Sequence, residues 1–472
     1  MTALHDLTAG QQLAALRSRE VSARELTEHY LGRIEKLDAE LGAFVTVAPE
    51  VALAAATGAD DRLARGEQAP LLGLPIGIKD LFPTAGLRTT FGSAALAEFV
   101  PAEDSWTVGL LRQAGAVVLG KTNTPEFGST CFTENDVTPQ AAATPYAPDR
   151  YASGSSGGAA AAVAAGLLPL AHASDGAGSI RTPAAACNLV GMKPSRGLVS
   201  PAPGAGYFSV GTEGPIARTV ADAALLLDVM AQPHSGDMYG WSSPTPFSAP
   251  APVRPLKIAM WTDTGLVDVD PHPEAERAAH RAADALRGLG HHVEQIAVPA
   301  AYSEPVRRAI DDMFGLLVAT AVHAMVPAER RDLVTPYNRR LAAVGEALTG
   351  AATLAFQTEL ARYAGAFLGV LADVDVVLTP TTNGPPVPFG HYATADARDV
   401  SDLMLAWSCY TPWANFAGTP SITLPSHLDD DGLPHGFQLV GRQRQDAELL
   451  ALAAQLEQAS PQSTVRPPCW IQ

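Results

Sequence analysis

Two glycine- and serine-rich turns enclose a run of small apolar residues, and this arrangement restricts the fold more than any other feature of the chain. The first turn is Gly154-Ser-Ser-Gly-Gly158, the run extends from Ala159 to Ala171, and the second turn is Asp175-Gly-Ala-Gly178. The run contains Gly166 and Pro169 and is shorter than the roughly 20 residues that a membrane span requires. We therefore predict a buried helix here.

Strands and helices alternate along the rest of the chain. Helices are predicted after the capping box Ser22-Ala-Arg-Glu25, over 108–112 and 274–286, and through most of 303–371. Strands are predicted over 75–78, 116–119, 257–260, 292–298, 374–378, 421–424 and 436–440. Asp429-Asp-Asp-Gly432 joins the last two as a tight hairpin turn rather than a cation site. The alternation predicts an α/β fold with a central mixed β-sheet covered by helices on both faces.

The size and charge of the chain exclude several classes of protein. Its 472 residues are enough to bury a core without a metal or a disulfide. Hydrophobic residues make up 47% of the chain and charged residues 17%, which is typical of a globular protein and not of a disordered one. The formal net charge of −17 argues against nucleic acid and anionic membranes as partners.

The cysteines and the first residues indicate the compartment. Cys131, Cys187, Cys409 and Cys469 are scattered without a CxxC pair, which is typical of free thiols in a reducing environment. The chain begins without a basic region followed by an apolar core, so we expect no signal peptide. We predict a cytoplasmic protein that uses neither a metal nor another cofactor.

Lysine is rare in this chain. Only Lys36, Lys79, Lys121, Lys193 and Lys257 occur, and the other 27 of the 32 basic residues are arginine. Arginine does not lose its proton in proteins, whereas a buried lysine can. Codon bias explains the low number, but each remaining lysine is a candidate for a site that needs a neutral amine.

The two turns are candidates for nucleophilic chemistry. Gly176, Ala177 and Gly178 precede Ser179, and backbone N–H groups that point outward beside a hydroxyl are what acyl transfer needs. Taken alone, either segment is better explained as an ordinary turn. The first turn also matches G-x-S-x-G, the nucleophile elbow of α/β-hydrolases, which would make Ser156 the nucleophile of an esterase.

Five motifs occur in order and together resemble the amidase signature family. They are Gly73-Leu-Pro-Ile-Gly-Ile-Lys-Asp80, Gly120-Lys-Thr-Asn-Thr-Pro-Glu-Phe-Gly128, Gly154-Ser-Ser-Gly-Gly158, Ser174-Asp-Gly-Ala-Gly-Ser-Ile-Arg-Thr-Pro183 and Gly191-Met-Lys-Pro-Ser-Arg-Gly197. The resemblance is strong over about 70–220 and 373–442 and weak over about 235–370. Five ordered motifs are far more specific than any one of them.

The resemblance implies a Ser–cis-Ser–Lys triad. Lys79 matches its lysine, Ser155 its bridging serine and Ser179 its nucleophile. The N–H groups of Gly176, Ala177, Gly178 and Ser179 would form the oxyanion hole. Supporting roles around the triad fall to Ser156, Asp175 and Arg181.

The implied chemistry is hydrolysis of carbon–nitrogen bonds in amides through a serine acyl-enzyme. Such a mechanism needs a lysine with a pKa near 7–8 instead of its free value of about 10.4, so Lys79 must be desolvated. Many relatives have glycine at the position of Ala177, and alanine would be strained by about 1 kcal/mol if that position required a positive φ. An alanine here also resembles the nylon-oligomer (6-aminohexanoate cyclic dimer) hydrolase branch, and aryl acylamidases are another branch that the chain resembles.

The family implies one large domain over 1–472. Its core would comprise about 20–230 and 373–465, with 235–370 more variable and forming the substrate pocket. Two further lysines in family motifs, Lys121 and Lys193, are expected to make structural ion pairs or carbonyl bonds. Candidate pocket residues are Cys131, Phe132 and Trp413, and also Tyr146, Phe208 and Trp407.

Two other functions remain open at this point. One is a glutamine-hydrolysing component of an amidotransferase. Such proteins have a glutamine-binding pattern in this region, and residues 356–367 show no clear counterpart of it. The other is the esterase built on Ser156. The expected substrate is a small aryl or alkyl amide, a cyclic amide or a carbamate. The expected partners are this substrate and a second copy of the chain in a homodimer.

Overall fold

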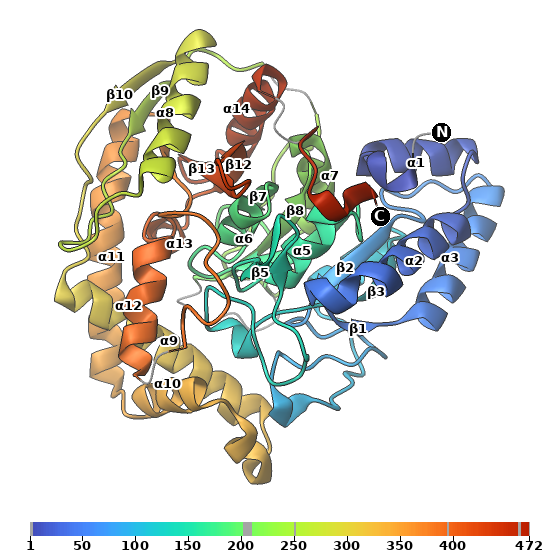
Figure 1. Ribbon diagram of the computed structural model, residues 1–472, viewed down its shortest axis with the longest axis horizontal. Coiled ribbons are helices and arrows are strands. Elements are labelled where there is room, and N and C mark those ends of the chain that lie inside the picture. Colours follow the sequence, from blue (N-terminus) through green and yellow to red (C-terminus); the bar gives the residue numbers. More distant parts are fainter. Residues whose placement is uncertain (1–2, 202–209, 250–251, 394–395, 461–463, 472) are drawn as a thin grey trace.

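One mixed sheet forms the centre of the molecule in the computed structural model, which describes residues 3–201, 210–249, 252–393, 396–460 and 464–471 (Figure 1). Within the described residues the sheet has 11 strands in the order β1-β3-β2-β6-β8-β7-β12-β13-β11-β9-β10. Strand β2 runs parallel to β3 and β6, and β9 runs parallel to β10 and β11. The remaining neighbours are antiparallel. This confirms the predicted mixed sheet.

The strands are short, and most of their residues are buried. They are β1 (Phe44–Val47), β2 (Pro75–Lys79), β3 (Val117–Thr122), β6 (Leu170–Asp175), β7 (Val190–Lys193), β8 (Thr212–Ala217), β9 (Lys257–Met260), β10 (His292–Gln295), β11 (Val376–Pro380), β12 (Ser421–Leu428) and β13 (Pro434–Gly441). A separate two-stranded sheet consists of β4 (Ala143–Thr144) and β5 (Ala147–Tyr151).

Helices flank this sheet (Figure 1). They are α1 (Ala9–Ser18), α2 (Ala23–Leu41), α3 (Pro49–Ala64), α4 (Trp106–Gln113), α5 (Gly157–Ala164), α6 (Arg181–Ala186), α7 (Val220–Met230), α8 (Pro273–Gly288), α9 (Glu304–Met325), α10 (Pro336–Glu346), α11 (Gly350–Asp373), α12 (Ala397–Ser408), α13 (Pro412–Ala417) and α14 (Asp446–Ala459).

Local sequence signals mark several of these boundaries. The predicted capping box opens α2, because the Ser22 hydroxyl accepts from the Glu25 N–H and the Glu25 carboxylate accepts from the Ser22 N–H. The predicted hairpin turn joins β12 and β13, and its Gly432 has a φ of +78° that suits glycine.

The prediction of one helix over Ala159–Ala171 is wrong in its extent. Helix α5 ends at Ala164, and β6 begins at Leu170. Gly166 has a φ of +69°, a conformation that ends a helix and that glycine adopts without strain. The run therefore folds as a buried helix followed by a buried strand. This brings its two flanking turns to the same region, where the Ser156 N–H donates to the Ser179 carbonyl at 3.2 Å.

The segment 235–370, where a weaker family resemblance was expected, contributes both strands and helices to the fold. Strands β9 and β10 extend one edge of the central sheet. Helices α9, α10 and α11 pack together beside α12, on the opposite side of the molecule from α1–α3 (Figure 1). The chain therefore forms a single α/β domain, as predicted.

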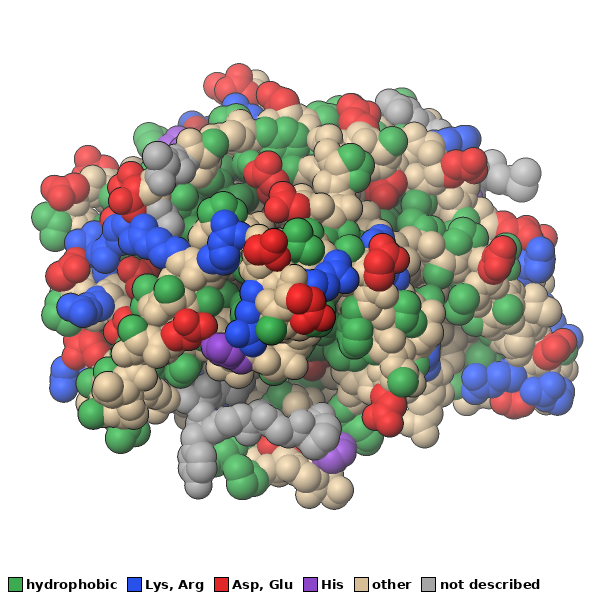
Figure 2. All heavy atoms as spheres, turned by 90° about the horizontal axis from the view of Figure 1, so that it is seen from below, with side chains coloured by type: hydrophobic (Ala, Val, Ile, Leu, Met, Phe, Trp, Pro, Cys, Tyr) green, Lys and Arg blue, Asp and Glu red, His purple; other side chains and the backbone are tan. Residues whose placement is uncertain are grey.

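The outer surface mixes charges of both signs. On the face drawn in Figure 2, acidic and basic side chains are interspersed with apolar ones. Among the described residues, no helix combines the length and the apolar character that crossing a bilayer requires.

Candidate active site

Lys79 ends the buried strand β2, and its side chain lies entirely inside the protein. Its Nζ lies 2.8 Å from the Ser155 Oγ and 3.0 Å from the Ser174 Oγ, and it also donates to the Ser174 carbonyl at 3.3 Å. Burial lowers the pKa of Lys79 to about 7, although the negative charge of Asp175 opposes this shift. The amine is therefore neutral in much of the population near neutral pH.

Ser155 and Ser156 lie in the turn that leads into α5. The peptide bond between Gly154 and Ser155 is cis, as the family resemblance implies for the bridging serine. The two hydroxyls face different partners. Ser155 contacts Lys79, whereas the Ser156 Oγ donates to the Ser174 carbonyl at 3.1 Å. Ser156 therefore holds the backbone that Lys79 also contacts.

The second turn follows the last residue of β6 and carries Ser179. Gly178 has a φ of +138°, where a side chain would collide with Thr411. Ala177 has no positive φ, so its methyl group causes no backbone strain. The requirement for glycine thus falls on position 178 and not on 177.

The N–H groups of this turn divide into two sets. The Gly178 N–H donates to the Asp175 carboxylate at 2.7 Å, and the Ile180 N–H donates to the same carboxylate at 3.2 Å. Within the described part of the chain, the N–H groups of Gly176, Ala177 and Ser179 have no protein acceptor. The prediction that Gly178 donates to an oxyanion therefore needs correction, because a buried carboxylate already occupies its N–H.

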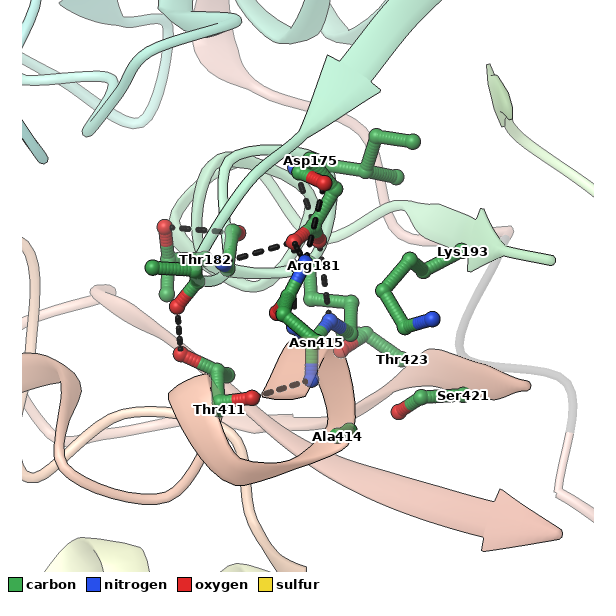
Figure 3. Close-up of polar contacts among 12 residues, drawn as sticks. Asp175, Arg181, Thr182, Lys193, Thr411, Ala414, Asn415, Ser421 and Thr423 are labelled. Carbon is green, nitrogen blue, oxygen red and sulfur yellow. Dashed lines mark hydrogen bonds and ion pairs between the residues drawn. The ribbon is translucent and has the colours of Figure 1, made fainter. Parts of the chain in front are cut away.

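A buried ion pair fixes the geometry of this turn (Figure 3). Arg181 makes two hydrogen bonds to the Asp175 carboxylate, at 2.9 and 3.0 Å, and neither side chain is exposed. Burial alone would raise the pKa of Asp175, but the Arg181 guanidinium outweighs it and holds this pKa far below its usual range. Arg181 also donates to the Gln438 and Asn415 side chains and to the Thr411 carbonyl. Asp175 and Arg181 therefore connect the turn to α13 and β13.

Ser179 lies in the wall of a cavity. Part of this wall comes from the two turns and from the loop after β3, and the rest comes from α9, α10 and α12, with one residue each from α6 and α13. The lining residues are Gly128, Ser129, Thr130, Cys131, Gly154, Ala177, Gly178, Ser179, Thr182, Arg307, Ile310, Asp311, Phe314, Tyr337, Leu341, Ser401, Asp402, Met404, Leu405, Ser408 and Pro412. In the described structure, no protein group makes a hydrogen bond with the Ser179 Oγ, so this hydroxyl is available to a ligand in the cavity.

Of the predicted pocket residues that the structure describes, one lines this cavity. Cys131 does, and burial raises the pKa of its thiol to about 12, so it stays protonated. Phe132 stacks on Tyr392 at 4.3 Å between ring centroids, outside the lining residues.

Trp413 is buried in the core, where it stacks on Phe367 at 4.7 Å, so the prediction that it lines the pocket is wrong. Its indole is large and apolar, and that property alone did not distinguish core from cavity. Tyr146 and Trp407 likewise donate to backbone carbonyls away from the cavity, and Phe208 lies outside the described residues.

The other two lysines of the family motifs make the expected carbonyl bonds. Lys121 donates to the Phe82 carbonyl and to the Thr84 hydroxyl, the latter at 2.7 Å. Lys193 donates to the Pro194 carbonyl at 2.9 Å and lies beside the Asp175–Arg181 pair (Figure 3). Neither residue lines the Ser179 cavity.

Sequence reasoning missed Ser174 and Thr182. Both lie inside the fourth motif, and that position was their only signal. Ser174 contacts the Lys79 amine with its hydroxyl and its carbonyl. The Thr182 hydroxyl makes hydrogen bonds to the carbonyls of Gly154 and Gly178, at 3.0 and 3.1 Å, and so joins the two turns.

The structure disfavours the esterase alternative. Ser156 is fully buried and lies outside the cavity lining. Its hydroxyl makes hydrogen bonds to Ser174 and, among the described residues, to no histidine. A nucleophile elbow needs both exposure and an adjacent base.

The segment considered for glutamine binding is part of the core. Residues 356–367 lie in α11, where Phe356, Leu360, Tyr363 and Phe367 are buried in a hydrophobic cluster. None of the residues of this segment lines the Ser179 cavity. This disfavours the amidotransferase alternative.

Comparisons with known proteins agree with this geometry. A family model described as amidase matches residues 25–450. A putative amidase from Synechocystis sp. is 36% identical, covering 96% of this chain and 88% of that protein. One component of the glutamyl-tRNA(Gln) amidotransferase from Desulforapulum autotrophicum is 35% identical, covering 97% and 98%. The solved structure of 6-aminohexanoate cyclic dimer hydrolase superposes with a TM-score of 0.90 at 30% identity, covering 99% and 100%. The chain belongs to the amidase family and is an enzyme that hydrolyses carbon–nitrogen bonds in amides.

Proposed function

We propose that Ser179 is the nucleophile of this hydrolase, with Ser155 and Lys79 as its proton relay. The observation that carries the proposal is a fully buried lysine, 2.8 Å from the Ser155 Oγ, beside a cavity whose wall contains the Ser179 hydroxyl. A buried amine can work as a base because desolvation keeps it neutral.

The proposed reaction has two halves. Neutral Lys79 takes a proton from Ser155, Ser155 takes one from Ser179, and the Ser179 Oγ attacks the amide carbonyl carbon. The relay then returns a proton to the leaving nitrogen, the C–N bond breaks, and an acyl ester remains on Ser179. Water attacks this ester after giving a proton to the same relay, and the carboxylic acid and free Ser179 are released.

We assign stabilisation of the tetrahedral oxyanion to the N–H groups of Gly176, Ala177 and Ser179. They are the N–H groups of the turn without a protein acceptor among the described residues, and Ala177 and Ser179 lie in the cavity wall. Asp175 holds the turn through the Gly178 and Ile180 N–H groups. Ser156 and Arg181 support it from outside the cavity.

The substrate class that we propose is a small amide with an apolar body. Ile310, Phe314, Leu341, Met404 and Leu405 give the cavity an apolar wall. Linear aryl or alkyl amides, cyclic amides and carbamates all carry the carbonyl that the mechanism needs. We propose that segment 235–370 forms the pocket through α9 and α10, and that the protein is cytoplasmic and works as a homodimer.

Active-site labelling tests the assignment. The protein is treated with a fluorophosphonate, and the modified peptide is mapped by mass spectrometry. We expect the label on Ser179, none in Ser179→Ala, and much slower labelling in Lys79→Ala. A label on Ser156, or unchanged labelling of Lys79→Ala, would contradict the proposed relay.

A further inference from the structure

Helix α9 places both apolar and charged side chains in the Ser179 cavity. Arg307, Ile310, Asp311 and Phe314 occupy positions i, i+3, i+4 and i+7 of the helix, so they lie on one face. Helix α12, which packs in the same part of the molecule, supplies Asp402 and other lining residues (Figure 1). The cavity thus combines an apolar wall with a charged region between α9 and α12.

Acidic side chains outnumber basic ones among the residues that line the cavity. Three carboxylates, Glu304, Asp311 and Asp402, share two guanidiniums, Arg307 and Arg398. Arg398 is divided among all three, at 3.3 Å from Glu304, 3.4 Å from Asp311 and 3.5 Å from Asp402. Arg307 lies 3.0 Å from Glu304 and 3.5 Å from Asp402. Two carboxylates, Asp311 and Asp402, and one guanidinium, Arg307, therefore line the Ser179 cavity, whereas Arg308, Arg340 and Arg398 line a neighbouring pocket that Asp311 also borders.

Asp311 is the carboxylate with the weakest compensation. Among the described residues its closest cation is Arg398 at 3.4 Å, which is longer than a charge-assisted hydrogen bond. The Ser401 hydroxyl, also in the cavity wall, is its other favourable contact. About a quarter of the Asp311 side chain remains accessible, at 26%. A ligand in the cavity can therefore reach it.

The arginine of the same helix face is less available to a ligand. The outer nitrogens of Arg307 are engaged by Glu304 and Asp402, and its Nε is buried without a partner in the described structure. A carboxylate on a ligand would have to compete with both acidic side chains. A cation would instead complement the two carboxylates of the cavity wall.

We propose that Asp311 binds a primary ammonium group of the substrate, so that the enzyme prefers amides that end in an amine at some distance from the scissile bond. The apolar wall then holds the hydrocarbon between the ammonium and the carbonyl at Ser179. This inference rests on Ser179 as the nucleophile of the cavity. It adds a specificity-determining residue from α9.

Matched substrate series test the proposal. The first series contains ω-aminoacyl p-nitroanilides of several chain lengths, and the second contains the same acyl chains with a methyl group in place of the ammonium. N-acyl diamines and N-acyl alkylamines form an equivalent pair with the amine on the leaving group. At the best length we expect kcat/KM to favour the ammonium substrate by about tenfold or more.

The variants should separate charge recognition from folding. In Asp311→Asn the preference should fall to about twofold or less, since the amide has nearly the same shape but no charge. In Asp311→Lys the preference in kcat/KM should reverse, so that carboxylate-terminated acyl anilides become the better substrates. Asp312→Asn is the matched control, because its carboxylate neighbours Asp311 in sequence but does not line the Ser179 cavity. The control should keep the wild-type preference.

The outcomes distinguish this inference from the proposed function. Equal kcat/KM for the two series, or a preference that survives in Asp311→Asn, overturns the role of Asp311 while Ser179-dependent hydrolysis stands. If neither series is hydrolysed, the same pairs compete against fluorophosphonate labelling of Ser179, and we expect the ammonium member to protect better. If Ser179 is neither labelled nor required for hydrolysis, the proposed function fails and the inference fails with it.

Discussion

At the scale of single residues, the central feature is a lysine whose surroundings favour the neutral amine. Lys79 is buried and contacts two hydroxyls and one carbonyl, while the Asp175 carboxylate, whose charge raises the pKa of Lys79, is already paired with Arg181. Desolvation of the ammonium is therefore only partly compensated, and the pKa of Lys79 falls to about 7.

This pKa predicts the pH dependence of hydrolysis. The proposed base must be neutral, so kcat/KM should be low below pH 7, rise through a midpoint near the pKa of about 7, and level off above it. The measurement is kcat/KM for a neutral amide between acid and mildly alkaline pH. In Lys79→Ala the residual activity should lose this rise, and a rise that persists there would assign the titration to another group.

Arginine cannot replace this lysine. The guanidinium of Lys79→Arg stays charged at all working pH values, so kcat should fall by about a thousandfold, in line with loss of a general base. The matched control is Lys36→Arg, because Lys36 is exposed on α2 and should tolerate the change. Thermal unfolding of both variants would show whether lost activity reflects lost structure.

Asp175 should support both stability and catalysis. Asp175→Asn leaves Arg181 buried without its counter-ion, so the free energy of unfolding should fall by about 3 kcal/mol. The turn also loses a charged acceptor for the Gly178 and Ile180 N–H groups, so kcat should fall more than KM rises. Denaturant unfolding and steady-state kinetics measure the two effects.

A surface ion pair provides the comparison for Asp175. Arg24 and Glu28 lie 2.9 Å apart on α2, and both side chains are about half exposed, at 51% and 49%. Solvent screens such a pair, so Glu28→Gln should change the free energy of unfolding by about 0.5 kcal/mol or less and leave kcat unchanged. An equal loss in the two variants would mean that the Asp175–Arg181 pair contributes no more than a surface pair.

At the scale of elements, the close packing of α9 against α10 places one wall of the cavity. The two helices approach each other at Gly315 and Gly345, where a methyl group on Gly345 would collide with the Gly315 carbonyl oxygen. Tyr337 and Leu341 reach the cavity from α10. The position of these side chains therefore depends on the distance between the helices.

Gly345→Ala should separate α9 from α10. We expect a loss of about 1–3 kcal/mol in the free energy of unfolding, because a tightly packed site cannot accept a methyl group without movement. KM should change as well, since both helices line the cavity. Gly369→Ala on α11 is the control, because a methyl group there meets no atom within 4 Å and improves helix propensity. It should raise stability by up to about 1 kcal/mol.

At the scale of the whole molecule, the two ends of the chain lie together on the side away from α9–α12 (Figure 1). The Trp470 indole donates to the Asp6 carboxylate at 2.7 Å and lies under the guanidiniums of Arg218 and Arg466, at 5.0 and 4.5 Å. The Arg33 guanidinium donates to the Trp470 carbonyl at 3.3 Å. These contacts hold the C-terminal segment against residues from the N-terminal part of the chain.

Trp470→Ala should therefore destabilise the domain without impairing catalysis. Removing this buried ring should lower the free energy of unfolding by about 3 kcal/mol, whereas kcat/KM should hold because Trp470 lies outside the cavity wall. Trp470→Phe keeps an aromatic ring under the arginines but loses the hydrogen bond to Asp6. It should therefore lower the free energy of unfolding by less than Trp470→Ala does. Equal unfolding curves for wild type and Trp470→Ala would show that the contacts between the termini do not contribute to stability.

The fold class and the proposed reacting groups could be predicted because their signals are local. Strand and helix periodicity marked most elements, and the motifs placed Lys79, Ser155 and Ser179 in one site. The prediction of one helix over Ala159–Ala171 was wrong because small apolar residues occur in buried helices and in buried strands alike. Ser174 gave no signal beyond its place in a motif, because a serine contacts a lysine only through the folded backbone.

The sequence by itself determined the α/β class, the family, the amide chemistry and the need for a lysine that can be neutral. Only the tertiary structure decided that the Gly178 N–H donates to the Asp175 carboxylate and that Trp413 lies in the hydrophobic core. It also decided that α9 and α12 place charged side chains at the cavity. The physical reason is that periodicity and motifs describe neighbours along the chain. Hydrogen-bond partners and burial instead depend on residues far apart, as in the bond from Arg181 to Gln438.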